Sequence, residues 1–281
     1  MKEHTNRKLN KELKIGLFLI SLFVIWAIAW TVYSNFIAGS ISSPYLPIAT
    51  ISNELLSPSS LFPLGTDIYG RSLLEVISEG LIYSLTLAII VSFIAAAIGI
   101  IIGYITAEGR GFLKYFCDLS TNLIFIFPSI LIAIMVMSVV GQSMSGLIVT
   151  MIFTGWPSYA KVARGEAQRV LSLSYVESAR AVGVSETRLF LKTVLPSILP
   201  VLIVNFVLGI SGVIVSEATL GFLGLGGSEY SWGNLLSMGK TVLLEAPYIV
   251  VFLSVILGTL IIGLNLLGDG LRDFIDPRKS S

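Results

Sequence analysis

Few residues in this chain could carry catalytic chemistry. The only histidine is His4, in a polar N-terminal segment, and the only cysteine is Cys117. A disulfide framework, a CxxC redox pair and a cysteine-rich metal site all need more of these residues. An intramembrane enzyme would need a Ser/His, Asp/Asp or HExxH set at membrane depth, and the sequence offers none. We therefore expect no catalytic residue, no metal site and no cofactor.

One segment resembles the end of a nucleotide-binding loop. Residues 234–241 read N-L-L-S-M-G-K-T, whereas the phosphate-binding pattern is G-x-x-x-x-G-K-[ST] after a strand. Asn234 stands where the first glycine is needed, and no strand precedes it. We expect no nucleotide binding here.

Ionisable residues within apolar stretches are functional candidates, because a charge is costly in lipid. Glu217 is the acid nearest to such a stretch. Two roles stay open for it, a possible gate or ligand on a transport path and a hydrogen-bonded structural acid. A secondary transporter would want several ionisable groups near mid-membrane together with inverted repeats. The sequence shows neither.

Two further patterns favour packing over chemistry. Gly99 and Gly103 form a G-x-x-x-G pair, which allows helices to approach closely, either inside one bundle or against a partner. Four methionines could suggest soft-metal ligation, but flexible packing against lipid or the core explains them better. They are Met135, Met137, Met144 and Met151.

The composition places the chain in a membrane. Hydrophobic residues make up 54% of it and charged residues 12%, against about 25% charged residues in soluble domains. A spanning helix needs roughly 20 mostly apolar residues. We expect an all-α membrane protein with six transmembrane helices, at 15–37, 81–106, 120–140, 145–160, 198–218 and 248–268. A hairpin at Gly141 separates the third and fourth spans, and Trp156-Pro157 interrupts the fourth.

The distribution of basic residues orients these spans, since cytoplasmic loops carry an excess of Lys and Arg. If the N-terminus lies inside, 16 basic residues lie in inner segments, and two, Arg71 and Lys240, lie in outer ones. Both termini are therefore expected in the cytoplasm. The first span exceeds the core of about 7–15 residues of a signal peptide, so we expect it to stay uncleaved.

The predicted inner loop at 161–195 is long and polar. Ser174 and Glu177 have the spacing of a capping box at a helix start. That helix is expected to run to Ala181 or Val182 and to stop at Gly183, which accepts the left-handed C-terminal conformation. Ser185 then caps a second short helix through Val194, which Pro196 ends. An apolar stripe on the first helix needs a partner; its residues are Tyr175, Val176, Ala179 and Val182.

This loop carries a resemblance to a known family. Residues 177–183 read E-S-A-R-A-V-G, and Leu195-Pro196 follows at a fixed distance. This is similar to the E-A-A-x-x-x-G, nine residues, I-x-L-P pattern of binding-protein-dependent ABC importer permeases; Ser178 and Thr193 depart from it. In that family the loop docks on the cytoplasmic ATPase. The resemblance thus implies coupling roles for Tyr175, Val176, Glu177, Ala179, Val182, Gly183, Leu195 and Pro196.

Three further segments narrow the resemblance to the "C"-type permeases of dipeptide, oligopeptide and nickel importers. Residues 63–71 (P-L-G-T-D-I-Y-G-R), 216–226 followed by 231–234 (S-W-G-N), and the C-terminal 265–278 match that family's patterns. Phe62 and Ser72 depart from the residues that are usual there. The resemblance implies a type I importer permease fold with a tail (1–14), a first transmembrane helix (15–37), an extracellular segment (38–79), a permease core (80–268) with coupling loop 161–195, and a tail (269–281).

The external segment holds the second candidate site. Asp67 and Arg71 are four residues apart and could pair across one helical turn. The pair could fix an external mouth for a binding protein, or it could cap the second span. The candidate residues are Gly65, Thr66, Asp67, Gly70 and Arg71.

The resemblance also implies partners. They are a homologous second permease, two cytoplasmic ATPase subunits and an extracellular substrate-binding protein, in the lipid of the cell membrane, with no nucleic acid. Peptides are the expected cargo, and nickel or another metal carried as a chelate is the alternative. A free-metal path would want His or carboxylate ligands in the spans, and Glu217 is the only such residue near one.

Overall fold

The structure, a computed structural model, describes residues 10–109 and 111–275. His4, Arg110 and the outer parts of the predicted tails, 1–9 of 1–14 and 276–281 of 269–281, lie outside the described residues. The described residues form α1 (Lys11–Val32, continued by a π-helical turn Tyr33–Ile37), a 3₁₀ turn Ile51–Asn53, α2 (Leu73–Glu108), α3 (Phe112–Ile126), α4 (Ser129–Val140), α5 (Met144–Leu171), α6 (Ser174–Ala181), α7 (Glu186–Leu189, continued by a π-helical segment Phe190–Val194), α8 (Leu195–Phe222), α9 (Trp232–Thr241) and α10 (Pro247–Ile275).

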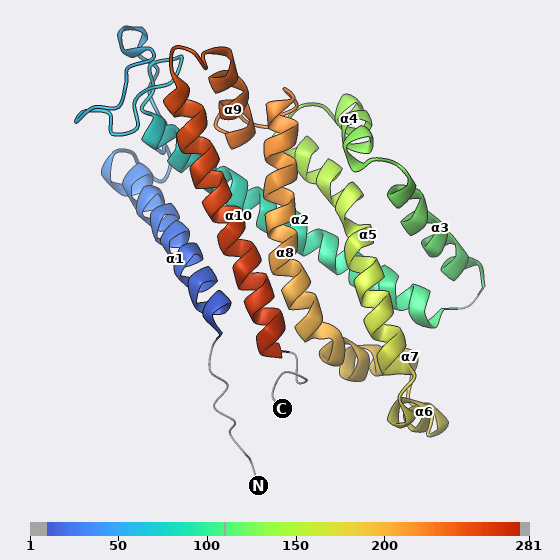
Figure 1. Cartoon of the computed structure of the whole chain (residues 1–281). Coiled ribbons are helices and arrows are strands. Elements are labelled where there is room, and N and C mark those ends of the chain that lie inside the picture. Colours follow the sequence, from blue (N-terminus) through green and yellow to red (C-terminus); the bar gives the residue numbers. More distant parts are fainter. Residues whose placement is uncertain (1–9, 110, 276–281) are drawn as a thin grey trace.

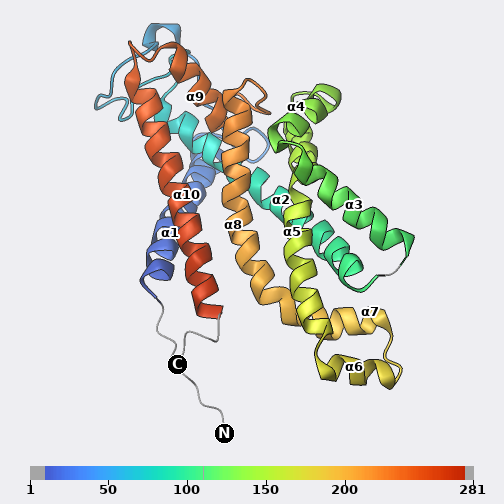
Figure 2. The same cartoon turned by 45° about the vertical axis from the view of Figure 1, so that its right-hand side comes forward.

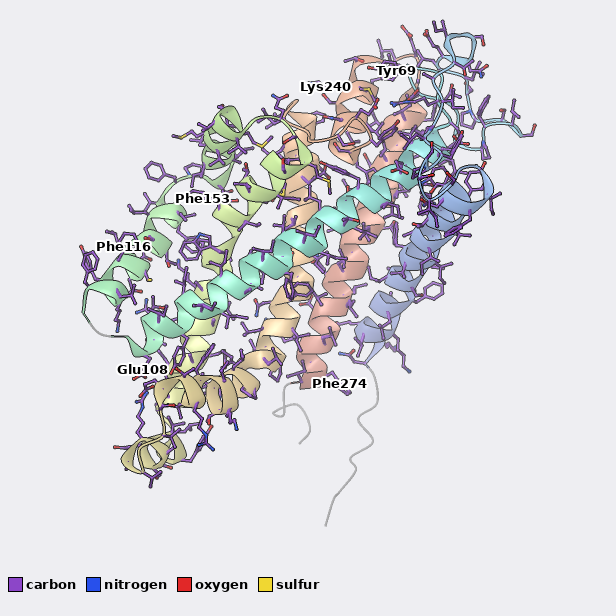
Figure 3. All side chains as sticks on the ribbon, turned by 180° about the vertical axis from the view of Figure 1, so that it is seen from behind. Tyr69, Glu108, Phe116, Phe153, Lys240 and Phe274 are labelled. Carbon is purple, nitrogen blue, oxygen red and sulfur yellow. The ribbon has the colours of Figure 1, made fainter. Side chains whose placement is uncertain are left out.

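The long helices form a bundle with two distinct ends (Figure 1). Helices α6 and α7 project beyond α5 and α8 at one end, here called the α6–α7 end. The segment 38–72 and helix α9 cover the other, the α9 end (Figures 1 and 2). Seen from behind, α2 crosses the bundle obliquely from one end to the other (Figure 3).

Four helical segments are long and apolar enough to cross a membrane: Lys11–Ile37, Leu73–Glu108, Glu186–Phe222 and Pro247–Ile275. They contain the predicted spans at 15–37, 81–106, 198–218 and 248–268. A fifth span arises if α3 and α4 count together. The chain is therefore an all-helical membrane protein with four to five spans by length and composition.

The predicted helix at 120–140 is not continuous but is broken into two helices. Helix α3 ends at Ile126, α4 begins at Ser129, and the two axes are bent by 101°. Pro128 explains the break, because proline disfavours a helical conformation in the residue before it. Phe127 accordingly has an extended backbone, with φ −89° and ψ 142°. The predicted hairpin at Gly141 is confirmed, since α4 ends at Val140 and α5 begins at Met144.

Two predictions about proline are also corrected. Helix α5 does not stop at Trp156-Pro157 but runs on to Leu171, so the polar loop that follows it is shorter than predicted. Pro196 does not end a helix; it lies in the first turn of α8, directly after the π-helical segment. The π-helical segment Phe190–Val194 therefore leads straight into α8.

Close helix contacts hold the bundle together. A Cβ at Gly99 would lie 2.5 Å from Tyr159 Cβ, and one at Gly103 would lie 2.6 Å from the Ala160 carbonyl oxygen. The predicted G-x-x-x-G pair thus packs α2 against α5 within this chain. A separate core cluster lies at the α6–α7 end; it contains Ala163, Ala167, Val170, Val176, Leu189, Val194, Ile198 and Leu202.

Candidate functional site

The first candidate site is α6, whose C-terminus has the predicted geometry. Gly183 has φ +82°, a value that favours glycine. Its N–H donates to the Arg180 carbonyl at 2.9 Å, and the Val184 N–H donates to the Ala179 carbonyl at 3.1 Å. This is the Schellman arrangement of a helix end. The predicted stop at Gly183 is confirmed.

The predicted N-terminal capping of this segment is wrong. Ser174 is the first helical residue of α6, Leu173 occupies the cap, and no side chain caps the helix there. The N–H groups of Val176 and Glu177 instead donate to the Leu173 carbonyl, at 2.9 and 3.4 Å. Ser185 does precede α7, but its side chain makes no cap hydrogen bond.

The predicted apolar stripe on α6 is divided between two sides of the helix. Val176 is fully buried in the chain's own core, and Ala179 is half-buried against the same cluster. Tyr175 is 49% exposed and Val182 is 82% exposed. Successive helical residues point about 100° apart, so Tyr175 and Val176 face different ways. The large exposed apolar side chains here are therefore Tyr175 of α6 and Val182, the residue directly after α6.

The other predicted coupling residues lie nearby or further along the chain. Glu177 and Gly183 are exposed at the α6–α7 end. Leu195 and Pro196 lie in the first turn of α8, with Leu195 half-buried and Pro196 exposed. The structure thus brings together the residues of 175–183, and the Leu-Pro pair directly follows Val194, which packs in the same core cluster as Val176.

The second candidate site, at the α9 end, is a tight turn around Asp67. One carboxylate oxygen of Asp67 accepts the N–H groups of Tyr69 and Arg71, both at 2.9 Å, and the other accepts Arg71 Nε at 2.7 Å. Gly70 has φ +71°. The predicted ion pair is confirmed, but the segment between the two residues is a non-helical turn and not one turn of a helix. Thr66, Asp67 and Arg71 are all buried.

Partners from distant parts of the chain complete this turn. Arg71 Nη1 reaches Glu229 Oε2 at 3.0 Å, and its guanidinium lies 4.8 Å from the Tyr69 ring centroid and 5.3 Å from that of Tyr230. Burial alone would lower the pKa of Arg71, but the hydrogen bond and charge of Asp67 raise it overall. Arg71 therefore stays cationic and fixes the turn to the segment before α9. Sequence reasoning missed Glu229 and Tyr230, and their spacing gave no signal.

Glu217 lies near the α9 end of α8 and is fully buried. Its Oε2 accepts the Ser84 hydroxyl of α2 at 3.1 Å, and Oε1 has no hydrogen-bond partner among the described residues. Ser216, one position earlier, is exposed and faces a different side of α8. Glu217 thus lies between α8 and α2.

A third candidate site is a groove that the sequence did not predict. A cavity of about 440 Å³ lies among α2, α5 and α8 and reaches Ser129 at the start of α4. A second cavity, of about 200 Å³, shares Ser129, Met151, Thr154 and Ser216 with it. Figure 2 shows α5 and α8 side by side, with α4 beside α5. Together these cavities form what we call the polar groove.

Uncharged polar side chains line part of the polar groove, and apolar residues and glycines line the rest. Its polar side chains are Ser92, Ser129, Thr154, Ser158, Tyr159, Asn205, Ser216 and Thr219. Neither cavity is lined by Asp, Glu, Lys, Arg, His or Cys among the described residues. Across residues 10–109 and 111–275, no group of three or more His, Cys, Asp or Glu side chains could hold a metal ion. The groove can offer hydrogen bonds but no ionic contact.

Comparisons with known proteins agree with this architecture. Residues 99–281 match the family model described as "Binding-protein-dependent transport system inner membrane component". The glutathione transport system permease protein GsiD of Escherichia coli is 31% identical over 260 residues, which cover 92% of this chain and 85% of that protein. Its counterpart in Pectobacterium atrosepticum is 30% identical over 262 residues, with 92% and 86% covered.

Solved structures show the same fold. A chain from inward-facing conformations of the MetNI methionine ABC transporter superposes with a TM-score of 0.60 at 19% identity, over 72% of this chain and 97% of that one. A chain from an amino acid ABC transporter crystallised with histidines gives 0.55 at 12% identity, over 71% and 94%. At these identities the likeness concerns the fold alone.

Proposed function

Because this chain belongs to the family of binding-protein-dependent transport system inner membrane components, we propose that it is the permease subunit of an ATP-driven importer of peptides. It is a multi-pass inner membrane protein and is not itself a catalyst. Membership in the family implies ATPase subunits and a binding protein as partners. The observation that carries the peptide cargo is the similarity to glutathione permeases over 92% of the chain, since glutathione is a tripeptide.

In this proposal the polar groove is this chain's half of the translocation path. Hydroxyl and amide groups can exchange hydrogen bonds with a peptide backbone of any sequence, whereas a charged lining would select by charge. A homologous second permease, facing the groove, would supply the other half. Nickel or a metal chelate, the alternative cargo, is favoured by no residue of the groove. Uptake of a labelled tripeptide into proteoliposomes tests the cargo class.

We place coupling to two ATPase subunits on the exposed part of α6. Tyr175 and Val182 offer an apolar contact, Gly183 sets the helix end, and Val176 anchors α6 to the permease. The turn at Asp67 and Arg71 would hold the external mouth, where the binding protein docks. We assign Glu217 to a structural role, because it bonds α2 and does not line the polar groove.

Six spans with both termini in the cytoplasm complete the proposal. The four long helices, the bent pair α3–α4 and helix α5 make six crossings. The α6–α7 end carries Arg164, Arg169, Arg180, Arg188 and Lys192, whereas the α9 end carries Arg71 and Lys240. This asymmetry favours a cytoplasmic α6–α7 end.

Cysteine labelling tests this topology. In a Cys117→Ser background, Ser43→Cys and Leu244→Cys should react with an impermeant thiol reagent in intact cells, because both positions are exposed at the α9 end. Ser185→Cys, exposed at the other end, should react only after the membrane is made permeable. Labelling of Ser185→Cys in intact cells would show that the orientation is reversed.

A further inference from the structure

Beyond Val176, α6 is held by a charged side chain. Val176 and Arg180 are four residues apart on α6 and so share a side of the helix. Arg180 forms an ion pair with Glu108, the last residue of α2. Its Nε also lies 3.3 Å from Glu186 Oε1 in α7. One guanidinium thus joins α6, α7 and the end of α2, and its planar fork suits two carboxylates.

A neighbouring contact reinforces this junction. Tyr104 of α2 donates its hydroxyl to Glu186 Oε2 at 3.3 Å, and its ring lies 4.4 Å from that of Phe190. The Arg180 and Glu108 side chains are 34% and 25% exposed, so the pair is partly shielded from water. Hydrogen bonding to Glu108 raises the pKa of Arg180, against the lowering effect of burial. Arg180 therefore stays cationic at this junction.

Helix α2 connects this junction to the opposite end of the molecule. It runs unbroken for 36 residues, or about 54 Å at 1.5 Å per residue, and contains no proline. Its first residue, Leu73, donates its N–H to the Gly65 carbonyl at 3.0 Å, directly after the turn at Asp67 and Arg71. Figure 3 shows Tyr69 of that turn at one end of the bundle and Glu108 at the other.

We propose that Arg180 is a positioning residue that fixes α6 to α2, so that a displacement of α6 is passed along α2 to the turn at Asp67 and Arg71. The inference rests on the proposed function, in which α6 contacts the ATPase. The apolar contacts of Val176 and Ala179 attach one side of α6 to the core cluster at this end. The ion pair to Glu108 provides a second point of attachment and makes α6 and α2 move together.

A charge exchange tests the proposal in the purified complex of this chain with its second permease and ATPases. Arg180→Glu should leave assembly and basal ATP hydrolysis intact, because the pair is partly exposed. Stimulation of hydrolysis by the loaded binding protein should fall about tenfold, within the range usual for coupled sites. Adding Glu108→Arg should restore part of it, because opposite charges meet again between positions 108 and 180, whereas the contact with Glu186 is not rebuilt. Arg169→Gln, which breaks the exposed pair with Glu166, is the matched control and should have no effect.

The outcomes separate this proposal from the proposed function. Stimulation is measured as ATP hydrolysis and does not depend on which molecule is transported. If Arg180→Glu keeps full stimulation, or if the exchange restores none in an assembled complex, Arg180 does not link α6 to α2. If the Arg180→Glu complex fails to assemble, Arg180→Gln removes the ion pair without charge repulsion, and its stimulation of ATP hydrolysis should fall in the same way. Wild-type complex that is stimulated but moves no peptide would instead overturn the proposed cargo.

Discussion

Replacement of Val182 by glutamate is expected to abolish ATP-driven uptake while the permease still folds and inserts. Val182 is 82% exposed, so a charge there is hydrated in the isolated chain and costs little. In the assembled importer the same charge would be buried against the ATPase without a partner. Burial of such an uncompensated charge costs on the order of several kcal/mol. The ATPase should therefore dissociate, which co-purification would measure.

The matched control is Val182→Leu, which keeps an apolar side chain at the same position. It should assemble and transport like the wild type. Ala179 is a poorer test position, because it is half-buried in the chain's own core and a charge there would also disturb folding.

Gly183→Trp tests the geometry of the helix end instead. The backbone φ of +82° at Gly183 disfavours any side chain by about 1 kcal/mol. The tryptophan variant should therefore couple ATP hydrolysis to uptake less well. Normal assembly and uptake with both Val182→Glu and Gly183→Trp would show that α6 is not the coupling element.

Replacement of Asn205 by aspartate is expected to make transport sensitive to peptide charge. Asn205 lines the polar groove and donates its amide to the Val201 carbonyl at 2.9 Å. A carboxylate cannot donate this bond, so it would turn into the groove. Two unit charges about 8 Å apart interact by about 2 kcal/mol at an effective dielectric of about 20. The uptake ratio of lysine-containing over glutamate-containing tripeptides should therefore rise more than about tenfold, since about 1.4 kcal/mol is tenfold.

Two controls make this ratio interpretable. Asn205→Ser removes the amide without adding charge and should leave the ratio unchanged. Asn205→Lys should shift the ratio in the opposite direction. The cost of placing a charge in the bundle, about 2.5–3.5 kcal/mol at mid-membrane, lowers the amount of folded protein equally for all peptides and cancels in the ratio. An unchanged ratio with both charged variants would remove the groove from the transport path.

Local features of the fold could be predicted from the sequence, because their causes lie within a few residues. Gly183 ends α6 because glycine tolerates positive φ, and Asp67 and Arg71 pair because Gly70, with φ +71°, turns the chain back between them. The break at Pro128 was predictable by the same kind of rule. The continuation of α5 through Pro157 was not predictable from local sequence, because neighbouring helices can satisfy the backbone groups that a proline frees in a membrane helix.

The candidate sites were harder to predict from the sequence than these local features, because they depend on tertiary contacts. Whether Val176 faced a partner or the chain's own core was decided by α5, α7 and α8, which pack around it. Glu229 lies 158 residues from Arg71, too far for any spacing rule. The polar groove arises from single hydroxyl and amide groups on α2, α4, α5 and α8, each of which is unremarkable within its own apolar stretch.

Uptake by proteoliposomes tests the central claim most directly. The vesicles would contain this chain, its second permease and the ATPases, with the binding protein outside and ATP inside. Labelled glutathione, or another small peptide that the binding protein holds, should accumulate in the lumen. It should not do so without ATP or when this chain is omitted, and a nickel–histidine chelate supplied in parallel should remain outside. Accumulation of the nickel chelate without peptide, or equal peptide uptake in vesicles that lack this chain, would contradict the assignment of this chain as a peptide permease.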